Sequence, residues 1–116
     1  MQTFVKQREV ISGVVSFETP PVDVSDYPLL TTELIAHQLT GTAPVLKAIL
    51  QTSGDLETWT LVGSAADAEV NAEGASYAAS SAAALPYGRY VRYTIDLTGT
   101  SPFAEYSLIL NTFASS

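Results

Sequence analysis

The sequence has no cysteine, a single histidine and only five lysine or arginine residues among its 116 positions. Without cysteine there are no disulfides and no thiolate metal ligands, and one histidine alone does not make a zinc site. Twelve aspartate and glutamate residues outweigh the five scattered cations and give a net charge of −7. Nucleic-acid binding needs a basic face that displaces counterions from phosphates, so we expect neither a nucleic acid nor a membrane surface as partner.

Long apolar stretches are also absent. No run approaches the roughly 20 apolar residues that span a bilayer. The N-terminal residues lack the apolar segment of a signal peptide, so no secretion signal is expected. Hydrophobic residues nevertheless make up 47% of the chain, and a chain of this length is expected to fold as one domain around its own core.

Short β-rich stretches separated by turn residues fill most of the chain. Strands are expected within residues 3–18 (interrupted at Gly13), 29–39, 45–52, 57–63, 68–70, 75–80, 89–97 and 103–113. This spacing predicts an all-β fold, an antiparallel β-sandwich or jelly roll of about seven or eight strands, with a barrel as the competing arrangement.

The division of the chain follows from the same pattern. Residues 1–18 are expected to form an N-terminal strand or arm, and residues 19–116 the β-sandwich domain. The alternation after residue 45 directs Leu46, Ala48 and Leu50 toward the core. In the alanine-rich stretch, a short helix over Ser80–Leu85 competes with the strand interpretation.

One six-residue motif occurs twice, 58 residues apart. Residues 39–44 are Leu-Thr-Gly-Thr-Ala-Pro, and residues 97–102 are Leu-Thr-Gly-Thr-Ser-Pro. Because glycine adopts positive φ easily, we predict that both copies are the turns of two similar hairpins, one in each half of the chain. The stretches after the two motifs match in their apolar alternation, whereas those before them differ at Glu33 and His37. If both turns lie at one end of the sandwich, they can form one binding rim.

No set of residues predicts catalysis or metal binding. His37 lies among apolar residues without a nucleophile motif, which favours a hydrogen-bonded sheet histidine over a catalytic base. The acidic residues are spread singly, and only Asp23–Asp26 and Asp67–Glu73 are loop clusters with oxygen ligands suited to calcium. We therefore predict a protein that is not an enzyme and has no metal or cofactor.

Residues 53–59, Ser-Gly-Asp-Leu-Glu-Thr-Trp, resemble the Asp-box hairpin of sialidase-type propellers. The resemblance covers Ser53, Asp55, Thr58 and Trp59, while Glu57 stands where that pattern has glycine. In those families the aspartate caps the turn and the tryptophan packs beneath it. The motif occurs once here, which excludes a propeller.

With this hairpin, the whole chain resembles the small, cysteine-free β-sandwich virion proteins of tailed phages. That resemblance implies a capsid decoration or head–tail component located in the virion and assembled in the host cytoplasm, which binds copies of itself and a shell protein. The residues predicted to form these interfaces are Phe4, Val5, Val10, Tyr87, Arg89 and Tyr90. A carbohydrate-binding or adhesion module is the alternative function, and a small hydrolase ranks third.

Overall fold

The computed structural model describes residues 2–24, 29–63, 67–72, 74–81 and 89–113. All regular structure in these ranges is β-strand, in one antiparallel hydrogen-bonded sheet of eight strands. The strands are β1 (Gln2–Ser12), β2 (Val15–Glu18), β3 (Val22–Asp23), β4 (Leu29–Ser53), β5 (Thr60–Leu61), β6 (Ala68–Val70), β7 (Ser76–Ser81) and β8 (Tyr90–Phe113). The predicted all-β class is confirmed, and the described residues contain no helix that could span a bilayer.

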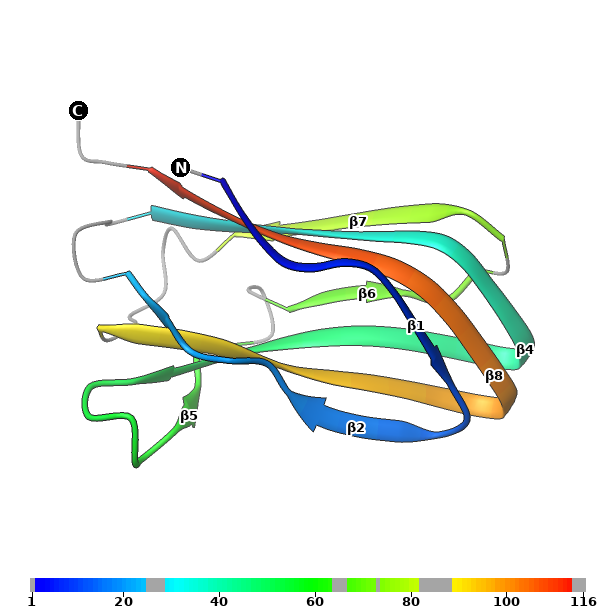
Figure 1. Cartoon of the computed structure of the whole chain (residues 1–116), viewed down its shortest axis with the longest axis horizontal. Helices are drawn as coiled ribbons and strands as arrows, with labels where there is room; N and C mark the ends of the chain where they lie inside the picture. Colours follow the sequence, from blue (N-terminus) through cyan, green and yellow to red (C-terminus); the bar gives the residue numbers. More distant parts are fainter. Residues whose placement is uncertain (1, 25–28, 64–66, 73, 82–88, 114–116) are drawn as a thin grey trace.

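Two long strands carry the architecture. β4 has 25 residues and β8 has 24, and they pair with each other along their whole length, from Leu29 opposite Phe113 to Ser53 opposite Tyr90. Figure 1 shows that both strands bend together at one end of the molecule, so that the paired ribbon folds back over itself. One continuous sheet therefore forms two layers.

Each layer has β4 and β8 at its centre and shorter strands at its edges. In the first, called here the β1–β7 layer, the order is β1, the second half of β8, the first half of β4, and β7. In the second, the β2–β6 layer, β2 and β3 flank the first half of β8, while β5 and β6 flank the second half of β4. This is a β-sandwich with jelly-roll connectivity, as predicted.

The first 18 residues contribute to both layers. β1 pairs with the second half of β8, the chain bends at Gly13 (φ 78°), and β2 pairs with the first half of β8. The segment expected as a strand or arm thus supplies one edge strand to each layer. Further along, β6 and β7 agree with the predicted strands, whereas the strand expected over 57–63 is reduced to β5. Ser80 and Ser81 belong to β7, and residues 82–85 of the competing helix lie outside the described ranges.

The prediction that the repeated motifs are hairpin turns is wrong. Residues 39–44 lie inside β4 and residues 97–102 inside β8, and the two halves of each strand are in different layers. Instead, the two motifs lie opposite each other at the common bend, with Thr42 paired with Thr100. These equivalent residues are 58 positions apart, and a local two-fold axis between the two strands relates them.

The backbone geometry of the two motifs is nearly the same. Gly41 and Gly99 have φ angles of 123° and 125°, and Ala43 and Ser101 both have φ of 50°. A Cβ atom on Gly41 would lie 3.0 Å from the Cα of Pro102, and one on Gly99 would lie 2.9 Å from the carbonyl oxygen of Ala43. Each glycine is therefore required both by its own conformation and by the close approach of the other strand.

The core lies between the layers and comes mostly from the two long strands. Its fully buried apolar side chains alternate with outward-facing residues, as the period of two requires. They include Leu30, Leu34, Leu39, Leu46, Ala48 and Leu50 of β4, and Val91, Tyr93, Ile95, Leu97, Ala104, Tyr106, Leu108 and Leu110 of β8. The predicted inward orientation of Leu46, Ala48 and Leu50 is confirmed.

A buried hydrogen bond crosses this core. The hydroxyl oxygens of Thr32, in the β1–β7 layer, and Tyr93, in the β2–β6 layer, lie 2.6 Å apart. Burial raises the pKa of Tyr93 well above its usual range, so the phenol stays neutral. Because a buried hydroxyl without a partner is unfavourable, this pair fixes the lateral position of one layer over the other.

We expect Gly41→Ala and Gly99→Ala each to lower the free energy of unfolding by about 1–3 kcal/mol, since each adds strain at positive φ and a close contact with the opposite strand. Gly54→Ala is the matched control, because nothing lies within 4 Å of a Cβ at that position. Urea denaturation of the three variants measures the difference. Equal stability of all three would show that the bend does not depend on these glycines.

Candidate functional site

The outer face of the β1–β7 layer carries a row of side chains that crosses all four strands. Directly opposite residues on antiparallel strands project from the same side of a sheet. The register places Phe4 opposite Ile109, Ile109 opposite Glu33, and Glu33 opposite Ala79. A carboxylate therefore lies between apolar neighbours at the centre of this face.

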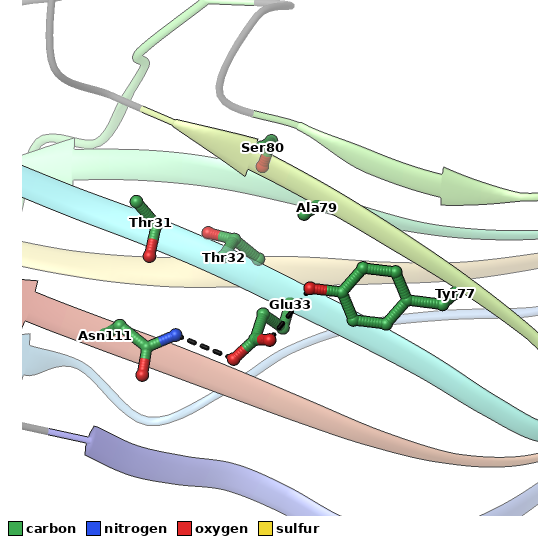
Figure 2. A pocket seen from close by; sticks show the side chains of 7 residues that line it. All are labelled: Thr31, Thr32, Glu33, Tyr77, Ala79, Ser80 and Asn111. Atoms are coloured by element: carbon green, nitrogen blue, oxygen red, sulfur yellow. Dashed lines mark hydrogen bonds between the residues drawn. The ribbon is translucent and has the colours of Figure 1, made fainter.

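Two side chains from neighbouring strands donate hydrogen bonds to Glu33 (Figure 2). The hydroxyl of Tyr77, on β7, donates to Oε1 at 2.8 Å, and the amide of Asn111, on β8, donates to Oε2 at 2.8 Å. The bond from Asn111, followed by that from Tyr77, lowers the pKa of Glu33 below its usual value. The same contact with Glu33 raises the pKa of Tyr77. The three side chains orient one another across three strands.

This group lies in an open hollow of about 690 Å³. Its lining consists of Thr31, Thr32, Glu33, Tyr77, Ala79, Ser80 and Asn111. The hollow thus offers hydroxyl, amide and carboxylate groups beside one exposed aromatic ring. A single carboxylate held by two donors can accept hydrogen bonds from the hydroxyl groups of a ligand, but it lacks the second acid of a glycosidase pair.

His37 lies nearby on the same face and is hydrogen-bonded. Its Nε2 is 2.9 Å from Oγ of Ser107, and the backbone N–H of Arg8 donates to the same oxygen at 3.1 Å. The registers of β1 and β4 shift next to Arg8 and His37 respectively, so one serine on the central strand β8 binds to both irregular segments. The prediction that His37 is a hydrogen-bonded sheet histidine is confirmed.

The loop over residues 53–59 is held by Asp55. Its Oδ1 accepts hydrogen bonds from the N–H groups of Thr58 and Glu57, both at 2.9 Å, and from the hydroxyl of Ser53 at 3.0 Å. These bonds, led by the one from Thr58, lower the pKa of Asp55. The aspartate therefore caps the turn, as the Asp-box resemblance implies.

Trp59 follows this loop on the outer face of the β2–β6 layer. The guanidinium carbon of Arg92 lies 4.2 Å from the centre of its ring, a cation–π contact, and Nε of Arg92 donates to the side chain of Gln51 at 2.9 Å. Trp59 is half-buried and does not belong to the buried core. The ring of Trp59 therefore packs on Arg92 at the surface of the sheet rather than between the two layers.

Three of the predicted interface residues lie on β1. The side chains of Phe4 and Val10 are 52% and 57% exposed, while Val5 packs against the core. Phe4 and Val10 lie opposite Ile109 and Glu105, which places both on the same outer face as Glu33. Their role as contact residues remains a prediction.

Of the other three predicted interface residues, the structure describes Arg89 and Tyr90, and neither is part of this face. Arg89 and Tyr90 lie at the start of β8 in the β2–β6 layer, and Tyr87 lies outside the described residues. Nε of Arg89 is 3.1 Å from Oδ2 of Asp23, and its guanidinium carbon is 5.2 Å from the ring centre of Tyr90. The structure thus places the five described residues of this set in two separate groups, one in each layer.

The two loop clusters considered for calcium are not assembled by the described residues. Asp26 and Glu73 lie outside those ranges, and Asp23 pairs with Arg89. Oδ1 of Asp67 accepts a hydrogen bond from the N–H of Leu50 at 3.0 Å, and burial raises the pKa of this carboxyl group. Among the residues that the structure describes, no three acidic or histidine side chains are grouped as metal ligands.

The comparisons with known proteins concern the fold. No protein-family model matches the chain, and no curated protein matches it in sequence. Its fold is similar to that of a chain in the solved structure of infectious bursal disease virus, Gt strain, with a TM-score of 0.57 and 13% sequence identity. The match covers 98% of this chain and 31% of the viral chain, so the sequence spans about a third of that chain's length.

We expect Ser107→Ala to lower the free energy of unfolding by about 1–3 kcal/mol, because it leaves the N–H of Arg8 and the ring of His37 without their partner. Ser16→Ala, at an exposed position of β2, is the control and should change it little. Thermal unfolding compares the two variants. A wild-type midpoint for Ser107→Ala would contradict the bridging role.

The pH dependence of stability should reveal the Glu33 contacts. Because the pKa of Glu33 in the fold is below the ordinary value of a glutamate, Glu33 stabilises the fold above that ordinary value, and the stabilisation is lost as the pH falls through its folded pKa. We therefore expect Glu33→Gln to be less stable than wild type at pH 7 and similar to it at low pH, as measured by denaturant unfolding. Tyr77→Phe, which removes one of the two hydrogen-bond donors to Glu33, should show part of the same loss of stability at pH 7. A stability difference between Glu33→Gln and wild type that does not depend on pH would contradict this role of the Glu33 contacts.

Proposed function

We propose that this chain is a structural subunit of a virus particle, which acts through contacts with copies of itself and with a shell protein rather than through catalysis. The supporting observation is the match of 98% of the chain to the fold of a chain in infectious bursal disease virus. Jelly rolls of this kind are among the folds from which viral capsids are built.

The surface of the β1–β7 layer is consistent with such a role. Phe4, Val10 and Tyr77 are each more than half exposed on its outer face, and Phe4 is next to Ile109 in the row that leads to Glu33. Single exposed apolar residues are common, but several on one sheet face are typical of a surface that is covered in an assembly.

The finer assignment is to the decoration or head–tail proteins of tailed phages, with assembly in the host cytoplasm. The capped loop at Asp55 supports it, because the resemblance to those proteins includes this hairpin. In such a particle the chain would be present at a fixed ratio to the shell protein.

Particles purified by density gradient from a virus preparation that carries this gene provide the test. We expect quantitative mass spectrometry to find the chain in the particle band at a constant stoichiometry to the shell protein. Absence of the chain from intact particles would overturn the proposal.

The alternative, a carbohydrate-binding module, is favoured by one observation. The hollow around Glu33 places an exposed tyrosine ring beside a carboxylate, an amide and hydroxyl groups, which is chemistry suited to neutral sugars. A monomer that binds neutral glycans on an array, and loses this binding with Tyr77→Ala, would favour the alternative.

A further inference from the structure

The two edge strands of the β1–β7 layer differ in how they are protected. An edge strand exposes unpaired backbone N–H and C=O groups, and bulges and inward-pointing charged residues are two ways in which proteins block its pairing with other chains. β1 has both features. Its register with β8 shifts twice, Arg8 has a φ of 49°, and Lys6 and Glu9 lie opposite the buried residues Leu108 and Tyr106.

The side-chain contacts of β1 strengthen this protection. Nζ of Lys6 lies 2.8 Å from Oε2 of Glu9, and the hydroxyl of Tyr106 donates to Oε1 of Glu9 at 2.8 Å. A strand that paired with β1 from outside would meet a bulged backbone and a fixed pair of charges. This edge is unsuited to the addition of another strand.

β7, at the opposite edge, has none of these features. Its six residues, Ser-Tyr-Ala-Ala-Ser-Ser, include no charge and no proline, and they pair with β4 at six successive positions without a register shift. Among the described strands, β4 is the only one that pairs with β7. Such a regular, uncharged edge is a template for strand addition.

The other edges of the described sheet differ from β7 in charge or in length. β2, β3 and β6 carry Glu18, Asp23 and Glu69, and β5 has only two residues. In a chain with a net charge of −7, β7 is therefore an exception. The side chain of Tyr77 does not extend over the outer edge of β7, because its hydroxyl donates a hydrogen bond to Glu33 on β4 and its ring lies toward that strand (Figure 2).

We propose that β7 pairs antiparallel with β7 of a second copy of this chain. In a two-fold symmetric pair, the same strand supplies both sides, so a charge near the symmetry centre lies close to the like charge of the other copy. An uncharged strand avoids this repulsion. If the partner were instead a different, basic strand, an acidic edge would suit it better than the uncharged β7. The contact joins two β1–β7 layers into one continuous sheet, and it rests on the proposed role in assembly.

The absence of cysteine allows a direct test by single-cysteine substitution at positions 77 to 80 of β7. Wild type should sediment as a dimer. A short thiol crosslinker that spans about 8 Å, the distance between diagonal neighbours on paired strands, should link the variants into covalent dimers. Crosslinking at the fastest position should be more than about tenfold faster than for Val10→Cys, a site on β1 that is as exposed as Tyr77 (57% each), because pairing raises the effective concentration of the thiols.

Antiparallel pairing also predicts the order of rates along β7. The fastest position marks the symmetry centre, and the rate falls on both sides because the two thiols separate by about 6.6 Å for each residue moved from that centre. A parallel arrangement would give similar rates at alternate positions. Circular dichroism of each variant verifies that the sheet is intact.

Three results would overturn this proposal: a wild-type monomer, equal crosslinking at Val10→Cys, or crosslinking of β7 only to another protein. These outcomes are separate from the test of function. A chain found in particles but not crosslinked through β7 contradicts the pairing alone. A chain that pairs through β7 but is absent from particles contradicts the virion role alone.

Discussion

The close approach of β4 and β8 at their common bend is the constraint on which the two-layer structure depends. Gly41 and Gly99 bring the two backbones so near that a methyl group on either would contact the other strand. Since the ribbon folds there, the centres of both layers come from the same two strands, and every other strand pairs with one of them. The sandwich is thus organised by one paired ribbon rather than by successive hairpins.

Much of this fold follows from the sequence, because alternation along a strand depends on local residues. It correctly orients Leu46 and its neighbours, and it finds β6 and β7 in the alanine-rich stretch. The prediction for the repeated motif is wrong because a Gly-Thr-x-Pro segment suits a hairpin turn and a strand bend equally well. Whether the segment forms a turn or a bend depends on its pairing with the other copy of the motif, 58 residues away, and the local sequence does not specify that pairing.

The candidate site illustrates the same limit. Glu33 differs from its counterpart Val91 in the repeat, and this was the signal in the sequence that the position is unusual. Its meaning depends on Tyr77 and Asn111, which reach it only through pairing of β4 with two other strands. The mismatch at His37 likewise has a structural cause, since the register shift beside it reverses which residues face the core.

The folded ribbon also determines how the chain can fold. β4 and β8 pair residues that are tens of positions apart, and Leu29 finds Phe113 only after nearly the whole chain is in place. Such nonlocal pairing carries a large loop-closure entropy before any contact compensates for it, and it is typical of proteins that fold in milliseconds to seconds. β5, β6 and β7 pair with β4 within residues 29–81, so they can form before the end of β8 arrives. β1 pairs with β8, with Gln2 opposite Asn111, and it should therefore be among the last of the described strands to become ordered.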